Sequence, residues 1–171
     1  FGEAVKTLAN MAGMRPYTFS KQDEEREKKW KEYLQIYSKY VEYYHEALIK
    51  NKNSETAKNY LKDRNLTIDE VKKFKIGYVE KNPNFFKFLE KEFDAKILLE
   101  TGLFYLDEKK NIYIERFKER IIFPIKNISG QPIALGGRIV NKKDYIAKYI
   151  NSPETPFFKK GSNLYNLDLA R

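Results

Sequence analysis

The spacing of the apolar residues changes at Gly102, and this change limits the fold more than any other feature of the sequence. Before Gly102 the apolar residues recur at three- and four-residue steps, as between Tyr33 and Leu48, which predicts amphipathic helices. After it they form short runs bounded by turn residues, which predicts strands. Helices followed by strands predict an α+β fold, with N-terminal helices before a mixed, mainly antiparallel sheet and a basic loop region. The expected strands are 103–106, 112–117, 121–126 and 132–140.

Capping residues mark the expected helix boundaries. Ser20 with Asp23, and Thr67 with Glu70, have the spacing of a capping box. Pro83 is expected at the first position of a helix, where its missing amide hydrogen costs nothing. The expected helices are 1–13, 20–50, 54–64, 67–77, 83–93 and 94–102.

Positive charge is concentrated in the last third of the chain. The 171 residues are 42% hydrophobic, enough for one domain with a core, and their formal net charge is +9. Residues 1–115 carry 22 Lys and Arg against 20 Asp and Glu, whereas residues 116–171 carry 11 against 4. This asymmetry favours an anionic partner for the C-terminal portion. The alternating charges of the N-terminal portion are typical of a solvated surface.

Several function classes are excluded by residues that the sequence lacks. There is no cysteine, hence no disulfide framework and no cysteine-based zinc site within these residues. The single histidine, His45, lies in the tyrosine-rich helical pattern, where a surface or packing role is expected, not that of a ligand or base. The acids of the last third are scattered and there is no P-loop, so the residues predict binding without a catalytic set. No apolar run approaches the length of a membrane span, so a cytoplasmic location without a membrane partner is expected.

The segment from Ala147 to Gly161 carries the strongest binding signal. It places three lysines, an asparagine and three aromatic residues around Pro153 and Pro156. Prolines restrict the backbone and predict a stiff loop, and cations with flat rings suit a ligand with phosphates and bases. Before it, a strand reaches two glycines and an arginine at 136–138, where glycine permits close approach or a sharp turn. Together these segments predict a nucleic-acid or nucleotide site.

Cations also alternate along residues 116–120, a run that joins two of the expected strands and is interpreted as a strand as well. Arg116, Lys118 and Arg120 would then share one face, because alternate residues of a strand point the same way. Three cations on one face need solvent or an anion. An exposed sheet edge whose charges discourage aggregation is the alternative interpretation.

Segments 116–125, 136–138, 148–155 and 160–165 resemble the bacterial replicative DNA primase family of the DnaG type. Segments 60–64 and 74–77 resemble it too, and 1–9 resembles the segment that leaves its zinc-binding domain. The most specific part is the run Asn-Ser-Pro-Glu-Thr at 151–155, and the resemblance covers nearly the whole chain. The chain departs from the family at Asn65, Ala147 and Lys159, where Gly, Pro and His are usual.

The resemblance implies a division of the chain and a larger parent protein. Residues 1–19 would be the end of the zinc-domain segment and a connector, and residues 20–171 the N-terminal subdomain of the RNA polymerase core. Because the chain starts at Phe1 and stops at Arg171, it is expected to be an inactive piece of a primase. The parent would be a DNA-directed RNA polymerase, a nucleotidyltransferase that makes RNA primers for replication. Its Mg²⁺-binding toprim subdomain, its Zn²⁺ domain and its C-terminal domain for the replicative helicase would lie outside these residues, which are expected to hold no cofactor.

The resemblance also implies a basic groove for single-stranded DNA template, RNA primer and ribonucleoside triphosphates. Lys148 and Lys160 would neutralise phosphates, and Arg138 would grip a phosphate with its fork. Tyr149 would stack on a base or sugar, with core packing as the alternative role. The full set of expected binding residues is Arg64, Arg116, Arg120, Arg138, Lys148, Tyr149, Asn151 and Lys160.

Two other functions stay open from the sequence. One is a self-contained module that binds single-stranded nucleic acid without any polymerase. The other is a helical interaction protein whose working surface is the tyrosine stripe from Tyr33 to Tyr44.

Overall fold

The computed structural model describes residues 2–14, 20–141 and 145–170, which belong to two units divided between residues 32 and 33. The first unit holds α1 (Gly2–Met11) and the first turns of α2 (Lys21–Lys50). The Asp23 amide donates to Ser20 Oγ at 3.2 Å, and the Ser20 amide donates to Asp23 Oδ2 at 3.0 Å. The predicted capping box is therefore confirmed. The predicted connector includes residues 15–19, which lie outside the described residues, and the division at residue 19 stays a prediction.

The second unit continues α2 and contains the sheet. Its further elements, in chain order, are η1 (Lys52–Ser54), α3 (Glu55–Asp63), α4 (Ile68–Lys73), β1 (Gly77–Val79), α5 (Phe85–Leu89), α6 (Ala95–Glu100), β2 (Phe104–Asp107), β3 (Ile112–Glu115), β4 (Arg120–Lys126), β5 (Pro132–Ile139), β6 (Tyr149–Asn151) and η2 (Lys160–Ser162).

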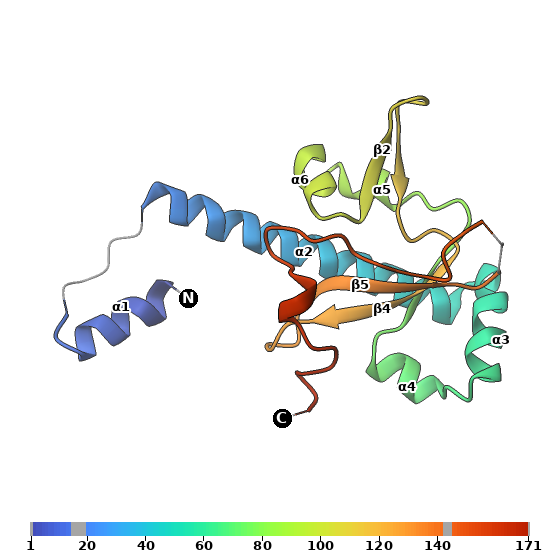
Figure 1. Cartoon of the computed structure of the whole chain (residues 1–171), viewed down its shortest axis with the longest axis horizontal. Coiled ribbons are helices and arrows are strands. Elements are labelled where there is room, and N and C mark those ends of the chain that lie inside the picture. Colours follow the sequence, from blue (N-terminus) through green and yellow to red (C-terminus); the bar gives the residue numbers. More distant parts are fainter. Residues whose placement is uncertain (1, 15–19, 142–144, 171) are drawn as a thin grey trace. The chain divides into compact units, whose positions relative to one another are not determined.

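Four strands form one sheet in the order β1-β4-β5-β6, and β2 and β3 form a separate hairpin. Every pairing in the described residues is antiparallel. Figure 1 shows β4 and β5 side by side, with α2 passing behind them and α3 and α4 at one end. The register sets Arg138 of β5 opposite Ile121 on one side and opposite Tyr149 on the other. The predicted α+β class is confirmed.

Two strands were missed by the sequence analysis, and one was extended too far. β1 is only three residues long, too short for an alternating pattern, and it forms where a helix end was expected. β6 forms inside the segment expected to be a loop, since both prolines of that segment follow the strand. β3 ends at Glu115, and residues 116–119 form a turn in which Glu119 has φ 58°. Arg116, Lys118 and Arg120 therefore do not alternate along one strand, and that prediction was wrong.

Helix boundaries agree where a side chain caps the helix. Thr67 and Glu70 form the predicted capping box at α4. Asn65, just after α3, has φ 58°, a left-handed conformation that asparagine tolerates. The expected helix 83–93 is shorter than predicted, because α5 begins at Phe85 after Asn84 and ends at Leu89. Pro83 therefore does not occupy the first helical position.

The tyrosine stripe of α2 is a packing face. Tyr33, Tyr37, Tyr40 and Tyr44 are each at most 1% exposed. The Tyr33 hydroxyl donates to the Ile133 carbonyl at 2.8 Å, and the Tyr37 hydroxyl donates to the Thr101 carbonyl at 2.9 Å. Because these four side chains are buried, they cannot form the exposed working surface that the hypothesis of a helical interaction protein requires. No helix in the part of the chain that the structure describes is long and apolar enough to cross a membrane.

The single histidine is a packing residue, one of the two roles expected for it. His45 is 4% exposed, and its Nδ1 lies 2.7 Å from the Ile76 carbonyl oxygen, to which it donates. Gly77 lies against the same turn of α2, where an added Cβ would meet the Tyr44 carbonyl carbon at 2.9 Å. The helix thus packs directly on the backbone of β1.

Gly102 sits at the boundary between the helical and sheet regions and meets the basic loop. Its φ is +71°, and an added Cβ would lie 2.4 Å from Pro153 Cγ. The left-handed backbone and the proline ring each require glycine here, for independent reasons.

A carboxyl group is buried beneath the tyrosine stripe. Glu115 is 3% exposed, and its two oxygens accept from the Tyr44 hydroxyl at 2.6 Å and the Phe85 amide at 2.8 Å. Burial raises the pKa of Glu115 above its ordinary 4.5, although both hydrogen bonds act in the opposite direction.

The raised pKa predicts that stability falls as the pH rises. Below pH 4.5 the carboxyl is protonated in both states and its contribution is fully present; this contribution is lost as the pH rises through the folded-state pKa. We expect the free energy of unfolding of the wild type to fall relative to that of Glu115→Gln, measured in urea between about pH 4 and pH 8. Parallel curves for the two proteins would contradict this prediction.

Candidate nucleic-acid interface

An arginine held between two tyrosine rings forms the centre of the candidate interface. The Arg138 guanidinium carbon lies 4.9 Å from the ring centroid of Tyr60 on α3 and 4.9 Å from that of Tyr149 on β6. Arg138 Nε donates to the Tyr60 hydroxyl. Its Nη1 is buried and has no hydrogen-bond partner among the described residues. Cation–π contacts and this hydrogen bond fix the orientation of the fork.

Two further cations contact the same rings. Arg64, at the end of α3, lies 5.4 Å from the Tyr60 ring centroid, and Lys148 lies 5.7 Å from that of Tyr149. Tyr149 is 64% exposed, so its alternative role as a core residue is excluded. We call these five residues the cation–aromatic cluster: Tyr60, Arg64, Arg138, Lys148 and Tyr149.

A cavity lies beside the cluster on the same face of the sheet. Gly136 is paired with Asn151 as Arg138 is paired with Tyr149, so the two pairs are separated by two residues, or about 7 Å, along the strands. An added Cβ on Gly136 would meet Asn151 Oδ1 at 3.4 Å. The cavity measures about 370 Å³ and is lined by Phe123, Ile125, Gly136, Asn151, Phe158, Lys160, Asn163 and Tyr165. Two predicted residues, Asn151 and Lys160, therefore meet at one cavity.

Arg120 is directed at the backbone of the chain itself. It is 5% exposed, and its guanidinium donates to the Ala147 carbonyl at 2.9 Å and the Lys148 carbonyl at 3.4 Å. Burial lowers the pKa of this guanidinium from its ordinary value. Arg120 therefore positions the residues that lead into β6.

Arg116 lies apart from the cluster. Its Nε donates to the Gly102 carbonyl at 2.7 Å, and its guanidinium lies 5.6 Å from the ring centroid of Tyr105 on the β2–β3 hairpin. Of the eight predicted residues, the structure gathers Arg64, Arg138, Lys148 and Tyr149 in the cluster and Asn151 and Lys160 at the cavity. Arg120 bonds to the backbone that leads into β6, and Arg116 contacts the β2–β3 hairpin.

Tyr60 was missing from the predicted site. The available signal was its position four residues before Arg64, one helical turn away, where two side chains meet on a helix. Its contact with Arg138 joins residues 78 positions apart, which periodicity does not reveal.

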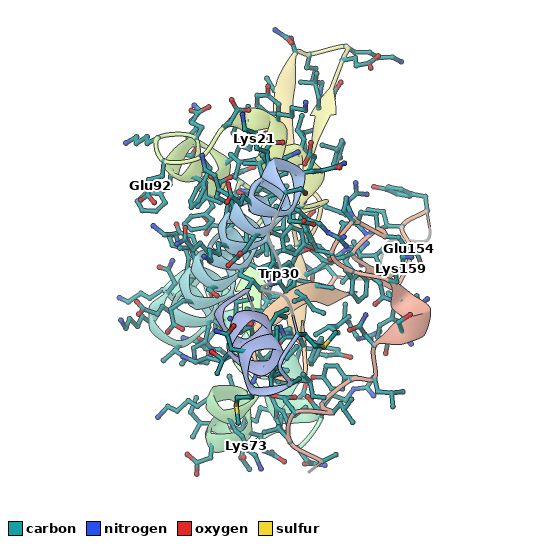
Figure 2. All side chains as sticks on the ribbon, turned by 90° about the vertical axis from the view of Figure 1, so that its left-hand side faces the viewer. Lys21, Trp30, Lys73, Glu92, Glu154 and Lys159 are labelled. Atoms are coloured by element: carbon teal, nitrogen blue, oxygen red, sulfur yellow. The ribbon has the colours of Figure 1, made fainter. Side chains whose placement is uncertain are left out.

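The loop after β6 is shaped by buried hydroxyls. Ser152 Oγ accepts from the Leu135 amide at 2.9 Å and lies 3.1 Å from the Tyr37 hydroxyl. Thr155 Oγ1 lies 3.1 Å from the Tyr33 hydroxyl and accepts from the Phe158 amide at 3.0 Å. Phe158 is 1% exposed, so it packs in the core. Figure 2 shows Glu154 and Lys159, both exposed, on the outer side of this loop.

The second glycine of the pair at 136–137 is required by packing. An added Cβ on Gly137 would lie 2.5 Å from Phe117 Cδ1 and 3.2 Å from Arg120 Cδ. The sequence predicted that another group would approach the backbone closely at these glycines. At Gly137 the groups that do so are the side chains of Phe117 and Arg120.

Comparison with known proteins identifies the family. Residues 43–171 match the model of the DNA primase catalytic core, N-terminal domain, and the chain belongs to this family. It is 41% identical over 140 residues to a DNA primase of Staphylococcus epidermidis, a match that covers 81% of this chain and 23% of that protein. The chain thus spans about a quarter of the length of the curated relatives it matches.

Solved structures agree in fold. A DNA primase domain from Pseudomonas aeruginosa is 36% identical, with a TM-score of 0.72 over 80% of this chain and 42% of that one. A DnaG primase catalytic domain bound to single-stranded DNA is 28% identical, with a TM-score of 0.71 over 83% of this chain and 44% of that one. The family resemblance recognised in the sequence is confirmed.

The two glycines of β5 are expected to respond to an added methyl group to different extents. Gly137→Ala forces Phe117 and Arg120 apart and should lower the free energy of unfolding by about 1–3 kcal/mol. In Gly136→Ala the added methyl group meets Asn151 Oδ1 and the Phe123 carbonyl oxygen at ordinary contact distances, so the free energy of unfolding should change by less than about 1 kcal/mol. Urea unfolding of both variants tests this, and equal losses would contradict the packing argument.

Proposed function

We propose that this chain is the part of a bacterial primase core that grips nucleic acid while RNA primers are made on single-stranded DNA. The observation that carries the proposal is the cation–aromatic cluster beside a cavity, lined in part by Asn151 and Lys160, on one face of the sheet. A relative of the same fold bound to single-stranded DNA supports it. The concentration of positive charge in residues 116–171 also supports it, because nucleic-acid affinity is dominated by phosphate contacts.

Each residue of the interface has a separate task in this proposal. Lys148 and Lys160 neutralise phosphates as compact charges. Tyr149 offers one ring face to Arg138 and the other to a base or sugar. Arg138 is held in place before a ligand arrives, and a phosphate oxygen that reached its buried Nη1 would satisfy that donor. Asn151 and Lys160 would orient a polar group inside the cavity.

The proposed parent protein supplies the chemistry that this chain lacks. Among the residues that the structure describes, no three acidic, histidine or cysteine side chains gather into a possible metal site. We assign the Mg²⁺ of the toprim subdomain and the Zn²⁺ of the N-terminal domain to other parts of that parent, as the family resemblance implies. RNA primer, ribonucleoside triphosphates and the replicative helicase are partners of that parent. The role of this chain is to bind and orient.

The salt dependence of single-stranded DNA binding tests the lysines. Removing two phosphate contacts with Lys148→Ala/Lys160→Ala should weaken binding and make the slope of log K against log salt shallower by about 1.4. Fluorescence anisotropy with a labelled oligonucleotide, repeated across salt concentrations, measures both quantities.

Lys109→Ala/Lys110→Ala is the matched control. It removes the same charge from the exposed turn between β2 and β3 and should leave the slope unchanged. Equal effects of the two double variants would mean that net charge alone determines binding. An unchanged slope in a folded Lys148→Ala/Lys160→Ala protein would move the phosphate contacts to the arginines.

Replacing the exposed ring separates stacking from charge. Tyr149→Leu should cost about 1–3 kcal/mol of binding free energy at every salt concentration, because a stacked ring carries no charge. The salt slope should remain that of the wild type. A loss that grows as salt is lowered would contradict stacking and indicate a displaced cation.

A further inference from the structure

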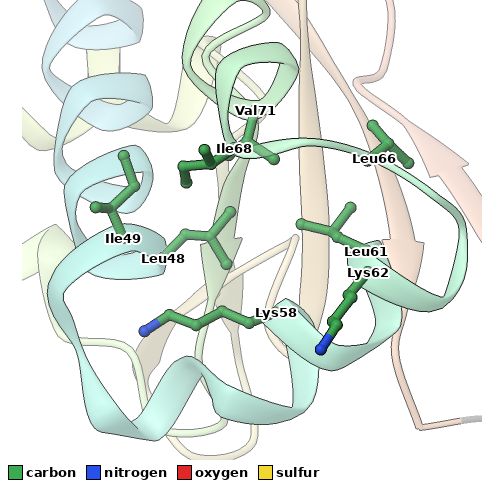
Figure 3. Close-up of a pocket in the computed structure, with 8 residues that line it drawn as sticks. All are labelled: Leu48, Ile49, Lys58, Leu61, Lys62, Leu66, Ile68 and Val71. Carbon is green, nitrogen blue, oxygen red and sulfur yellow. The ribbon is translucent and has the colours of Figure 1, made fainter.

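A second recess opens where the end of α2 meets α3 and α4 (Figure 3). We call it the α3–α4 groove. It measures about 350 Å³ and is lined by Leu48, Ile49, Lys58, Leu61, Lys62, Leu66, Ile68 and Val71. None of these residues belongs to the candidate nucleic-acid interface.

The floor of the groove is hydrophobic core that remains accessible through its mouth. Leu48, Leu61 and Val71 are each at most 5% exposed and belong to one core cluster. Ile68, in contrast, is 55% exposed at the start of α4. Together the apolar floor and the exposed isoleucine form an apolar surface, and burying that surface against a partner would be favourable in free energy.

The charged side chains of the lining are both lysines. Lys58 and Lys62 are one turn apart on α3, and Figure 3 shows both on the same side of the groove. Lys58 donates to the Asn51 carbonyl at 3.2 Å, a neutral partner that leaves its charge for an incoming anion. An apolar recess with a cationic edge is complementary to a ligand that is apolar on one side and acidic beside it.

The groove and the interface use opposite sides of α3. Residues two apart on a helix are separated by about 200° around its axis. Tyr60 and Arg64 extend toward Arg138 and its ring contacts, so Lys58 and Lys62 point away from the cluster. The lysines are therefore not an extension of the proposed phosphate contacts.

We propose that the α3–α4 groove docks an acidic amphipathic helix of a partner protein. Apolar side chains of that helix enter the recess over Leu48, Leu61 and Val71, as in other helix-in-groove complexes. Carboxylates one turn apart on the partner pair with Lys58 and Lys62, whose spacing they match. The occupant is a protein segment, because the apolar lining of the groove favours buried apolar side chains, which a phosphate backbone does not supply.

Methyl NMR with two designed peptides tests the proposal on the whole chain. The probe is a synthetic helix of about 14 residues with leucines at i, i+3, i+4 and i+7 and glutamates beside them. Its matched control carries lysines in place of the glutamates. We expect the acidic peptide to shift the methyl signals of Leu48, Ile68 and Val71, and to bind Lys58→Glu/Lys62→Glu about tenfold more weakly.

One control variant and one further test variant separate the contributions of charge and of apolar contact. Lys109→Glu/Lys110→Glu makes the same charge change outside the groove and should bind the acidic peptide like the wild type. Ile68→Ser removes the exposed apolar edge, keeps both lysines and should also weaken binding.

Three results would overturn the proposal. The first is the absence of methyl shifts at millimolar acidic peptide, and the second is equal binding of the acidic and basic peptides. The third is a Lys58→Glu/Lys62→Glu variant that loses affinity for single-stranded DNA but keeps its affinity for the acidic peptide. That last result would assign the lysines to nucleic acid.

Discussion

Three phenol hydroxyls on the buried face of α2 connect the parts of the second unit. Tyr33 bonds to the β5 backbone and to Thr155, and Tyr37 bonds to the Thr101 carbonyl and to Ser152. Tyr44 bonds to Glu115 at the end of β3. A buried donor or acceptor that loses its hydrogen-bond partner costs free energy. These contacts therefore fix the helix, the sheet and the loop after β6 in one arrangement.

The same arrangement holds the backbone of the proposed binding face in place. Ser152 and Thr155 anchor the chain directly after β6, and Arg120 holds the carbonyls directly before it. The short strand between these anchors presents Tyr149 and Asn151 on one face of the sheet. An exposed pair of side chains is thus carried by a backbone fixed from both ends, which lowers the ordering cost of binding.

Much of the fold could be predicted from the sequence, because periodicity and capping are local. The long helix, its buried tyrosines and the two capping boxes follow from residues within one or two turns of each other. The three-residue strand β1 is too short to alternate, and β6 depends on its partner β5. The contact of Tyr60 with Arg138, and the turn that separates Arg116 from Arg120, depend on tertiary placement and were not predictable.

Gly102 constrains how a chain of this kind can diverge. Its left-handed backbone disfavours other residues, and Pro153 occupies the space that any side chain would need. A smaller residue at position 153 would remove the clash but leave the backbone strain, so no single compensating change restores a substituted Gly102. Gly102 is therefore expected to persist even in lineages in which the loop sequence varies, whereas the residue at position 153 can change as long as Gly102 remains.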